Sequence, residues 1–490
     1  MIRTDASQPV SPLNRFRADL EGPDRIARLR GGLIGDGKAI DGPFGRKTLL
    51  YADYVASGRA LRQVETFMLE EVLPYYANSH TEASYCGEFI TRLRHDARET
   101  IARQIGAGSD YSVIFAGSGA TAGLNRLVPL FGIREALARG EQVLVLHGPY
   151  EHHSNILPWR ESGAEVVEVR EGHAGGPDLE MLENELRRTA GYGLRVGAFS
   201  ALSNVTGIVT DTDAVTTVLK RHGALAVWDY AGGGPYLDVA MAPTPTTAKD
   251  AVVFSTHKFP GGPGGSGVLV VRNEAVRATR PTSPGGGTVR FVAPWFHDYV
   301  GDLVSREEAG TPNVLGDIRA ALAFIVKDAV GQAFIDARHA ELNRRALAVW
   351  QHNPNLMLFG IDPEKQRVPI FSFKVRDPAG NGLIHHQLFT RMLSDVHGIQ
   401  ARGGCVCAGP YGISLMGIDR PTAEALRDTV NAGHELAKPG WVRLNFSYLL
   451  SDEKADRIIA AVDDLARHPY PMADRYRGDD ATAHFSPVAA

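Results

Sequence analysis

The chain has 490 residues, of which 44% are hydrophobic and 22% charged, a composition typical of a globular protein with more than one domain. Its 52 Lys and Arg residues against 56 Asp and Glu residues give a net charge of −4, which argues against nucleic-acid and anionic-membrane partners. Three cysteines are too few for a disulfide framework. With neither a membrane-length apolar run nor an apolar signal segment at the start, we expect a cytoplasmic protein.

The chain divides by pattern into four segments. Residues 1–45 are polar apart from one amphipathic stretch and are expected to form an extension that joins the small domain. From 46 to 330, β-branched runs alternate with helical patterns, which predicts a large α/β domain whose mostly parallel sheet carries helices on both faces. A long helical pattern then leads into a small α+β domain at 331–475, and residues 476–490 are expected to form a flexible tail.

The predicted elements follow one another closely along the chain. Strands are expected at 113–117, 142–148, 165–170, 195–202, 224–229, 251–255 and 267–272 in the large domain, and at 370–375 and 441–449 in the small one. Helices are expected at 13–33, 178–189, 213–222 and 319–347.

The clearest local pattern is AVVFSTHKFPGGPGGSGVLVV, in which Lys258 follows one β-rich run and a glycine-rich loop leads into the next. A lysine buried between strands is costly to desolvate unless it is paired or neutral. Bonding it to an aldehyde cofactor as an imine meets that requirement, and the glycines within 261–267 would let the backbone pass close to the cofactor. The alternative is a surface lysine in a loop that connects two strands.

Three further segments fit such a cofactor, and each also has a plainer interpretation. Asp229 ends an apolar strand, where it could pair with a protonated pyridine nitrogen or cap a helix. FAGSGATAGLNRL follows a strand and opens a helix with Gly, Ser and Thr, an arrangement that binds phosphate, although the motif is loose. In EHHSN (151–155) an imidazole could lie on the cofactor ring, or the histidines could belong to a surface cluster. A zinc site shared with Cys405 and Cys407 lacks the usual ligand spacing.

Taken in order, the phosphate loop, EHHSN, SNVTG, WDYA, STHK, EEAGTPN and RGGCVCAG resemble the class V aminotransferase superfamily of fold-type I pyridoxal 5'-phosphate (PLP) enzymes. The similarity runs from about Tyr51 to Leu449 and is greatest to the group II cysteine desulfurase and selenocysteine lyase type. It implies a large PLP-binding domain, a small C-terminal domain, and a homodimer with its active sites at the subunit interface.

The resemblance also implies roles for individual residues. Lys258 would bind PLP covalently, Asp229 would pair with the ring nitrogen, and His152 would stack on the ring. Asn204 would contact the side of the ring that carries the hydroxyl. The phosphate contacts that the resemblance implies are Ala120, Thr121, Ser255, His257 and, toward the phosphate of the partner subunit, Thr311.

Substrate binding and sulfur chemistry are implied for the C-terminal part of the chain. Arg443 in VRLNF would bind the substrate α-carboxylate, which suits a bidentate guanidinium. In ARGGCVCAGPYG, aligned on the substrate-binding Arg402, Cys407 takes the position of the desulfurase nucleophile and Cys405 lies two residues earlier. A thiolate at that position would attack the sulfur of bound cysteine and become a persulfide. The alternative is that both cysteines are small packing residues.

Two positions depart from the family pattern. Gly232 stands where the family has a glutamine that contacts the PLP ring hydroxyl, and Thr81 stands where it has an arginine. Both differences remove cofactor contacts and widen the pocket, so an amino acid larger than cysteine is an alternative substrate.

We therefore expect a PLP-dependent enzyme of the cysteine desulfurase type that takes an amino-acid substrate, passes sulfur to an acceptor protein and needs no metal. One alternative is a class V lyase, epimerase or aminotransferase that acts on a larger amino acid without a persulfide step. The other is a PLP-fold protein that has lost its chemistry and serves as a binding subunit.

Overall fold

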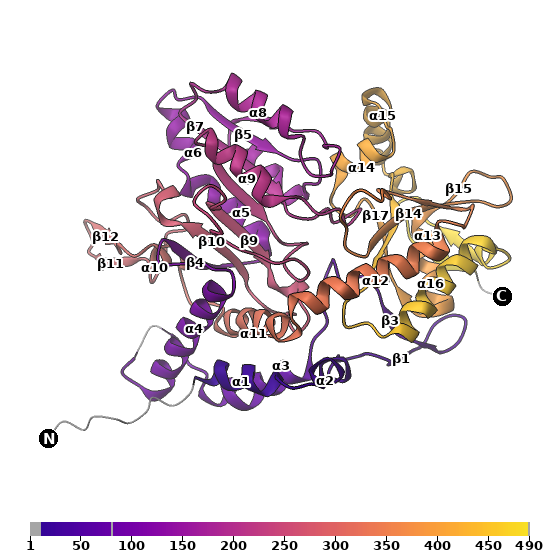
Figure 1. Cartoon of the computed structure of the whole chain (residues 1–490), viewed down its shortest axis with the longest axis horizontal. Coiled ribbons are helices and arrows are strands. Elements are labelled where there is room, and N and C mark those ends of the chain that lie inside the picture. The colour runs from indigo at the N-terminus through magenta and orange to yellow at the C-terminus, as the bar shows by residue number, and fades with distance from the viewer. Residues whose placement is uncertain (1–10, 80–81, 489–490) are drawn as a thin grey trace.

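The computed structural model describes residues 11–79 and 82–488, and its centre is a seven-stranded sheet (Figure 1). The strands are β4 (Tyr111–Gly117), β5 (Val143–His147), β6 (Glu165–Glu168), β7 (Leu194–Ser200), β8 (Leu225–Asp229), β9 (Ala251–Ser255) and β10 (Gly267–Arg272). Their order is β4-β10-β9-β8-β7-β5-β6, and β10 runs antiparallel to both of its neighbours while β9, β8, β7, β5 and β6 are parallel. The alternation of β-branched runs and helical patterns thus correctly predicts a mostly parallel sheet.

Successive residues of each strand face opposite layers of helices. Along β9, Val252 and Phe254 belong to one apolar layer, whereas Ala251 and Val253 belong to the other. The helices of the first layer are α4 (Tyr85–Gln104), α8 (Leu179–Arg188), α9 (Thr212–Arg221) and α11 (Val314–Val330). The second layer is formed by α5 (Gly119–Leu130), α6 (Ile133–Ala138) and α7 (Leu157–Arg160). Because both faces are covered, the strands are apolar almost throughout.

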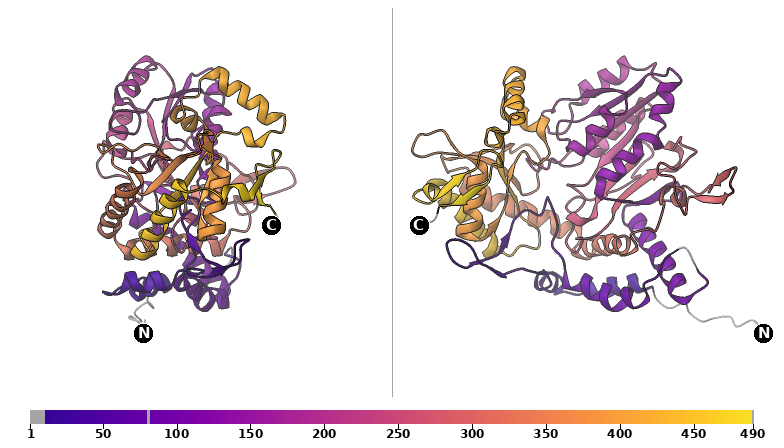
Figure 2. Two further views of the ribbon diagram at one scale, coloured as in Figure 1. Left: turned by 90° about the vertical axis from the view of Figure 1, so that its right-hand side faces the viewer. Right: turned by 180° about the vertical axis from the view of Figure 1, so that it is seen from behind.

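A smaller sheet and its helices form the second domain (Figure 2). Its strands are β13 (Leu356–Leu358), β14 (Ile370–Arg376), β15 (Leu383–Ile384), β17 (Arg402–Gly404) and β18 (Trp441–Asn445). Its helices are α12 (Gln332–Trp350), α13 (His386–His397), α14 (Gly409–Leu415), α15 (Arg420–Asn431) and α16 (Asp452–Arg467). Gly331, between α11 and α12, lies where the sequence pattern places the boundary between the domains.

The helices of the N-terminal segment pack on the large domain, and the stretch that follows them contacts the small domain. The helices are α1 (Pro12–Leu20) and α2 (Arg25–Gly31), and their apolar side chains, such as Leu13 and Phe16, enter the same core as α11. Contacts with the small domain follow from Arg30, Asp36 and Phe44 onward, and β3 (Leu50–Tyr51) then pairs with β16 (Ile399–Gln400). The helices lie on the large domain because the apolar stripe of α1 finds its complement on α11.

The C-terminal segment was expected to be a flexible tail, but its described part forms regular structure. Within 476–488, β19 (Tyr476–Gly478) and β20 (Phe485–Pro487) form an antiparallel hairpin. The ring of Tyr476 packs against Phe44 at a centroid distance of 5.9 Å, and its hydroxyl donates to Asp395 at 3.0 Å. One buried aromatic residue thereby anchors a segment whose composition predicts disorder.

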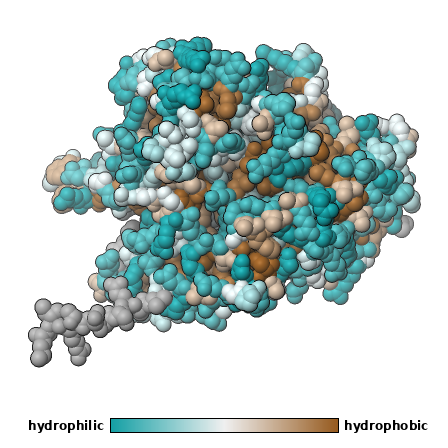
Figure 3. Space-filling view, in the orientation of Figure 1, coloured by the Kyte–Doolittle hydropathy of each residue, from teal (hydrophilic) through white to brown (hydrophobic). Residues whose placement is uncertain are grey.

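A second hairpin projects from the large domain and ends in apolar side chains. It consists of β11 (Val289–Val292) and β12 (His297–Tyr299) and extends at the left of Figure 1. Trp295 at its tip is 85% exposed, and Phe291 and Phe296 stack on each other beside it. Its end forms the tan surface at the left edge of Figure 3.

The other short strands and α-helices are β1 (Ala39–Ile40), β2 (Lys47–Thr48), α3 (Arg62–Phe67) and α10 (Leu303–Glu307). Across the described parts of the chain, every helix is too short or too polar to pass through a lipid bilayer.

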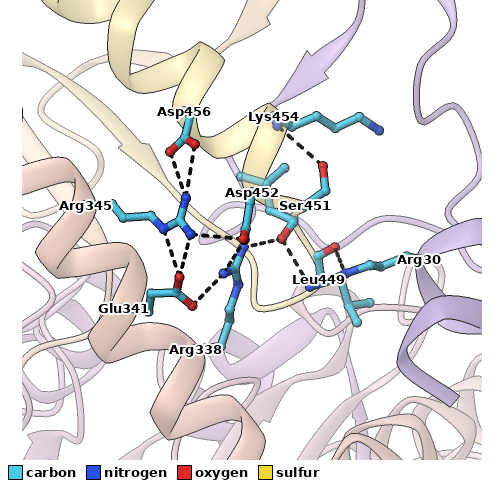
Figure 4. Close-up of polar contacts among 10 residues, drawn as sticks. Arg30, Arg338, Glu341, Arg345, Leu449, Ser451, Asp452, Lys454 and Asp456 are labelled. Carbon is cyan, nitrogen blue, oxygen red and sulfur yellow. Dashed lines mark hydrogen bonds and ion pairs between the residues drawn. The ribbon is translucent and has the colours of Figure 1, made fainter. Parts of the chain in front are cut away.

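An ion-pair network joins α12 to the start of α16 (Figure 4). Arg338 of α12 is 6% exposed; it pairs with Asp452 at 2.6 Å and donates to the carbonyl of Leu450 at 2.8 Å. From α2, Arg30 donates to the carbonyl of Leu449 at 3.0 Å. The other members of the network are Glu341, Arg345 and Asp456. The start of α16 is therefore held from both α12 and the N-terminal segment.

Replacing Arg338 with alanine is expected to lower the free energy of unfolding by about 2 kcal/mol. The substitution removes a nearly buried guanidinium together with its ion pair to Asp452 and its hydrogen bond to the Leu450 carbonyl. Arg345 is the matched control. It also lies on α12 and pairs with Glu341 and Asp456, but its side chain is far more exposed than that of Arg338. Urea denaturation should show a clear shift for Arg338→Ala and a much smaller one for Arg345→Ala. Equal shifts would mean that burial does not set the strength of this network.

Candidate functional site

A pocket opens where several strands of the large sheet end. Its walls come from the loops after β4, β5, β7, β8 and β9, the edge at which open α/β sheets bind ligands. The lining residues are Ala120, Thr121, Tyr150, His152, Ser154, Ser200, Leu202, Asn204, Asp229, Ala231, Gly232, Ser255 and Lys258. Residues predicted from five separate motifs thus meet in one place.

Lys258 and Asp229 face this pocket from neighbouring strands. Lys258 ends the 3-10 turn η4 (Thr256–Lys258) directly after β9, and Asp229 is the last residue of β8. Burial lowers the pKa of Lys258 and raises the pKa of Asp229, which is 5% exposed, while the attraction between the two charges opposes both shifts. A lysine with a lowered pKa is a better nucleophile toward a carbonyl group.

His152 lies at the start of η3 (His153–Asn155) and caps it with its own ring. Its Nδ1 accepts the backbone N–H of Ser154 at 3.1 Å, which fixes the ring where it lines the pocket. Burial, followed by the nearby charge of Lys258, lowers the pKa of His152 to about 4. The ring is therefore neutral at neutral pH and suited to stacking on a flat ligand.

The N-terminus of α5 forms a small cradle beside Ser255. Gly119 has a φ of +62°, and a Cβ there would come within 2.9 Å of Ser255 Oγ and 3.3 Å of His257 Cε1. The next residue, Ala120, donates its N–H to Ser255 Oγ at 2.9 Å, and Thr121 Oγ1 lies 2.7 Å from Ser154 Oγ. Backbone N–H groups, hydroxyls and a helix N-terminus together favour an anion.

Asn204 and Gly232 line the wall next to Asp229. Asn204 donates through Nδ2 to the carbonyl of Val406 at 3.0 Å, but its buried Oδ1 has no partner among the described residues. Because Asn204 lines the pocket, this oxygen is free to accept a hydrogen bond from a ligand bound there. A Cβ on Gly232 would meet only atoms of Leu202, at 3.9 Å, so the missing side chain leaves open space as expected.

The other predicted residues lie outside this pocket. Arg443 is 3% exposed on β18 and donates to the carbonyl of Asn204 at 3.2 Å, so it borders the site. Cys407 is exposed and Cys405 half-buried, both between β17 and α14, and neither lines the pocket. Thr311 is exposed before α11, away from the pocket of its own chain. Thr81 lies outside the described residues.

The family model Aminotransferase class-V matches residues 50–423, which is most of the chain. The chain belongs to the class V aminotransferase family. A protein of Vibrio cholerae named "Probable cysteine desulfurase" is 28% identical over 422 residues, covering 84% of this chain and 93% of that protein. One of the same name from Halalkalibacterium halodurans is 28% identical over 367 residues, covering 74% of this chain and 84% of the other.

Solved structures with the same fold include two cysteine desulfurases. The apo structure of the Thermococcus onnurineus enzyme has a TM-score of 0.70 at 23% sequence identity and covers 86% of this chain and 95% of its own. The Escherichia coli enzyme CsdA, with an S-sulfonic acid, has a TM-score of 0.66 at 22% identity and covers 90% of this chain and 98% of its own. These similarities identify the fold as fold-type I, as the sequence resemblance implies.

Class V enzymes depend on PLP, and the residues of this pocket fit that cofactor. The cradle that a Cβ at Gly119 would fill suits the phosphate, and the unpartnered Oδ1 of Asn204 suits the ring hydroxyl. Asp229 can pair with the ring nitrogen, and the amine of Lys258 can bond to the aldehyde. The protein is thus a PLP-dependent enzyme.

Asp53 is a site residue of this class V enzyme that the sequence interpretation missed. Arg402 and Arg443 face each other across β17 and β18, and Asp53 bridges them. It accepts from Arg443 NH2 at 2.9 Å through one oxygen and from Arg402 Nε at 3.0 Å through the other. Burial lowers the pKa of Arg443, and the Asp53 carboxylate opposes that shift. Two guanidinium groups paired with one carboxylate leave a net positive charge beside the pocket.

Glu151 is a second residue that was missed. It is buried beneath the pocket, where it accepts from the backbone N–H of Ser200 at 2.8 Å, the Ser200 hydroxyl at 2.6 Å and the Asn155 amide at 2.6 Å. Burial raises the pKa of Glu151 to about 7. These bonds join the end of β7 to the turn that presents His152, so Glu151 supports two walls of the site. Its only signal in the sequence is its place within EHHSN.

Proposed function

We propose that this enzyme is a PLP-dependent cysteine desulfurase, which removes sulfur from L-cysteine and releases L-alanine. The observation that carries the proposal is an exposed cysteine, Cys407, on a glycine-flanked loop that is hydrogen-bonded to the cofactor-binding segment. The names of the relatives support the same reaction.

The proposed roles follow from the positions of the side chains. Bound PLP supplies an electron sink for bond breaking at the α-carbon of the substrate. Arg443 binds the substrate carboxylate, and the Lys258 amine accepts the α-proton. His152 would cover the ring of bound PLP, and Asp229 would keep the ring nitrogen protonated.

In the sulfur step, the Cys407 thiolate attacks the sulfur of the substrate. An S–S bond forms and the C–S bond breaks, its electron pair going to the carbon side, which is protonated and leaves as L-alanine. Cys407 is left as a persulfide, which an acceptor thiol or an added reductant then discharges. Cys405, two residues earlier, is half-buried and is proposed to have no part in this step.

We also propose a homodimer in the cytoplasm, with a sulfur-acceptor protein as its partner. Thr311 is exposed and does not line the pocket of its own chain, in keeping with a contact to the partner subunit's phosphate. The exposed hairpin around Trp295 gives such a dimer an apolar surface to bury. The three cysteines are all free, which suits a reducing compartment.

The purified enzyme with L-cysteine and a thiol reductant is expected to release alanine and sulfide in equal amounts. Replacing Cys407 with alanine should reduce both products by about 100-fold or more, because the nucleophile is lost. Cys405→Ala is the matched control on the same loop and should retain most of the activity. Pyruvate and ammonia in place of alanine and sulfide, or full activity in Cys407→Ala, would contradict the proposal.

A further inference from the structure

The loop that carries Cys407 has a backbone conformation that must be held in place by contacts. Val406 and Cys407 have φ values of 48° and 57°, in the left-handed region. Residues with a Cβ rarely adopt this region, and a β-branched valine does so least of all. The isolated loop would relax to other conformations, so the observed one depends on what surrounds it.

Three hydrogen bonds from the large domain hold this loop. Asn204 donates through Nδ2 to the carbonyl of Val406 at 3.0 Å. The backbone N–H of His153 donates to the carbonyl of Cys407 at 2.9 Å, and the Nε2 of His153 accepts the N–H of Gly409 at 3.0 Å. His153 therefore makes two of the three bonds, one on the cysteine itself and one two residues later.

The His153 ring can act as this acceptor only in its neutral form with the proton on Nδ1. Burial, followed by the charge of Arg160, lowers the pKa of His153, which keeps the ring neutral at neutral pH. Its neighbour His152 lines the cofactor pocket, with the two ring centroids 6.1 Å apart. Consecutive residues thus serve the cofactor pocket and the cysteine loop.

A second contact joins the same two segments. Tyr150, which lines the pocket, packs edge-on against Tyr411 of α14 at a centroid distance of 4.9 Å. Both hydroxyls donate to the carboxylate of Glu171, at 2.7 Å and 3.3 Å. The region after the cysteine is therefore anchored independently of His153, and loss of the His153 ring should release the loop locally and leave α14 in place.

We propose that His153 is a positioning residue that holds the Cys407 loop against the cofactor-binding segment by accepting the Gly409 N–H. This role rests on the proposed function, in which the Cys407 thiolate must reach the sulfur of a substrate bound in the pocket. His153 does not touch the cofactor or the substrate; it acts through the loop.

The test compares His153→Leu with His153→Gln. Glutamine places an amide oxygen near the position of Nε2 and can accept the Gly409 N–H, whereas leucine fills the space without an acceptor. Hydrogen–deuterium exchange of the peptide spanning 402–412 should become about tenfold faster in His153→Leu, the factor expected from one hydrogen bond, and stay near the wild-type rate in His153→Gln. Peptides from the large sheet are the internal control and should not change.

Kinetics with L-cysteine give the second measurement. The kcat of His153→Leu should fall about tenfold with KM unchanged, because the carboxylate site at Arg443 is untouched, and His153→Gln should restore most of it. His153→Ala, which also lacks an acceptor, replaces the leucine variant if that one does not fold. Equal exchange rates in the leucine and glutamine variants would overturn the role of His153. If His153→Leu exchanges faster but the wild-type enzyme produces no sulfide from L-cysteine, the proposed function is overturned while the anchoring role of His153 is supported.

Discussion

Replacing Lys258 with alanine is expected to abolish both turnover and covalent cofactor attachment. Lys258 is the one lysine among the described residues that line the pocket, and it faces Asp229 from the adjoining strand. An amine with a burial-lowered pKa is suited both to bond with an aldehyde and to accept the α-proton of the substrate. Losing both roles should reduce kcat/KM for L-cysteine by about 1000-fold or more.

Borohydride reduction followed by intact mass measurement checks the attachment directly. The wild-type chain should gain the mass of one reduced PLP, and Lys258→Ala should gain none. Lys258→Arg is the matched control, because it keeps a positive charge beside Asp229 but cannot form the bond. Like Lys258→Ala, Lys258→Arg should gain no mass after borohydride reduction. A covalently labelled Lys258→Ala chain would place the attachment on another lysine.

Replacing Arg443 with alanine is expected to lower kcat/KM for L-cysteine by about 100-fold, mainly through KM, because a buried guanidinium that binds a carboxylate is lost. Its position supports the size of this effect. Arg443 is 3% exposed and lies between Asp53 and the backbone of Asn204, at the edge of the pocket. Arg443→Lys should recover little, since an ammonium group cannot reproduce the two-pronged geometry.

Arg402→Ala supplies the comparison. Arg402 bonds to the same Asp53 carboxylate, but its side chain is 48% exposed, so its loss should raise KM far less. Steady-state kinetics will compare the KM values of Arg402→Ala and Arg443→Ala. Visible spectra will check that both variants contain the cofactor. A larger effect at Arg402 than at Arg443 would exchange the roles proposed for the two arginines.

The sequence predicts the large sheet and most of the pocket because both depend on local patterns. Short β-branched runs mark the strands, and loops that follow parallel strands must meet at one edge, so Lys258, Asp229 and His152 converge as expected. Asp53 could not be found this way, since its partner Arg443 lies 390 positions later in the chain. The bridge exists only because β17 and β18 bring two arginines opposite each other.

Two features of the structure were not predicted from the sequence, and both have the same origin. Composition predicts a loose tail at 476–490, but the burial of Tyr476 against Phe44 anchors the hairpin formed within it. The N-terminal segment was expected to join the small domain, which Asp36 and Phe44 contact, but the packing of the apolar face of α1 on α11 was not predicted. In both cases a tertiary contact decides the structure, and a single sequence read locally carries no record of such a contact.

The left-handed conformation at position 407 has a consequence for how this sequence changes over generations. A glycine or an asparagine would occupy that φ of 57° at less conformational cost than cysteine does. If fold stability alone were under selection, substitutions at position 407 would therefore tend to replace cysteine. A lineage that keeps the thiol there does so against the preference of its own backbone, so position 407 reports whether sulfur chemistry is still under selection.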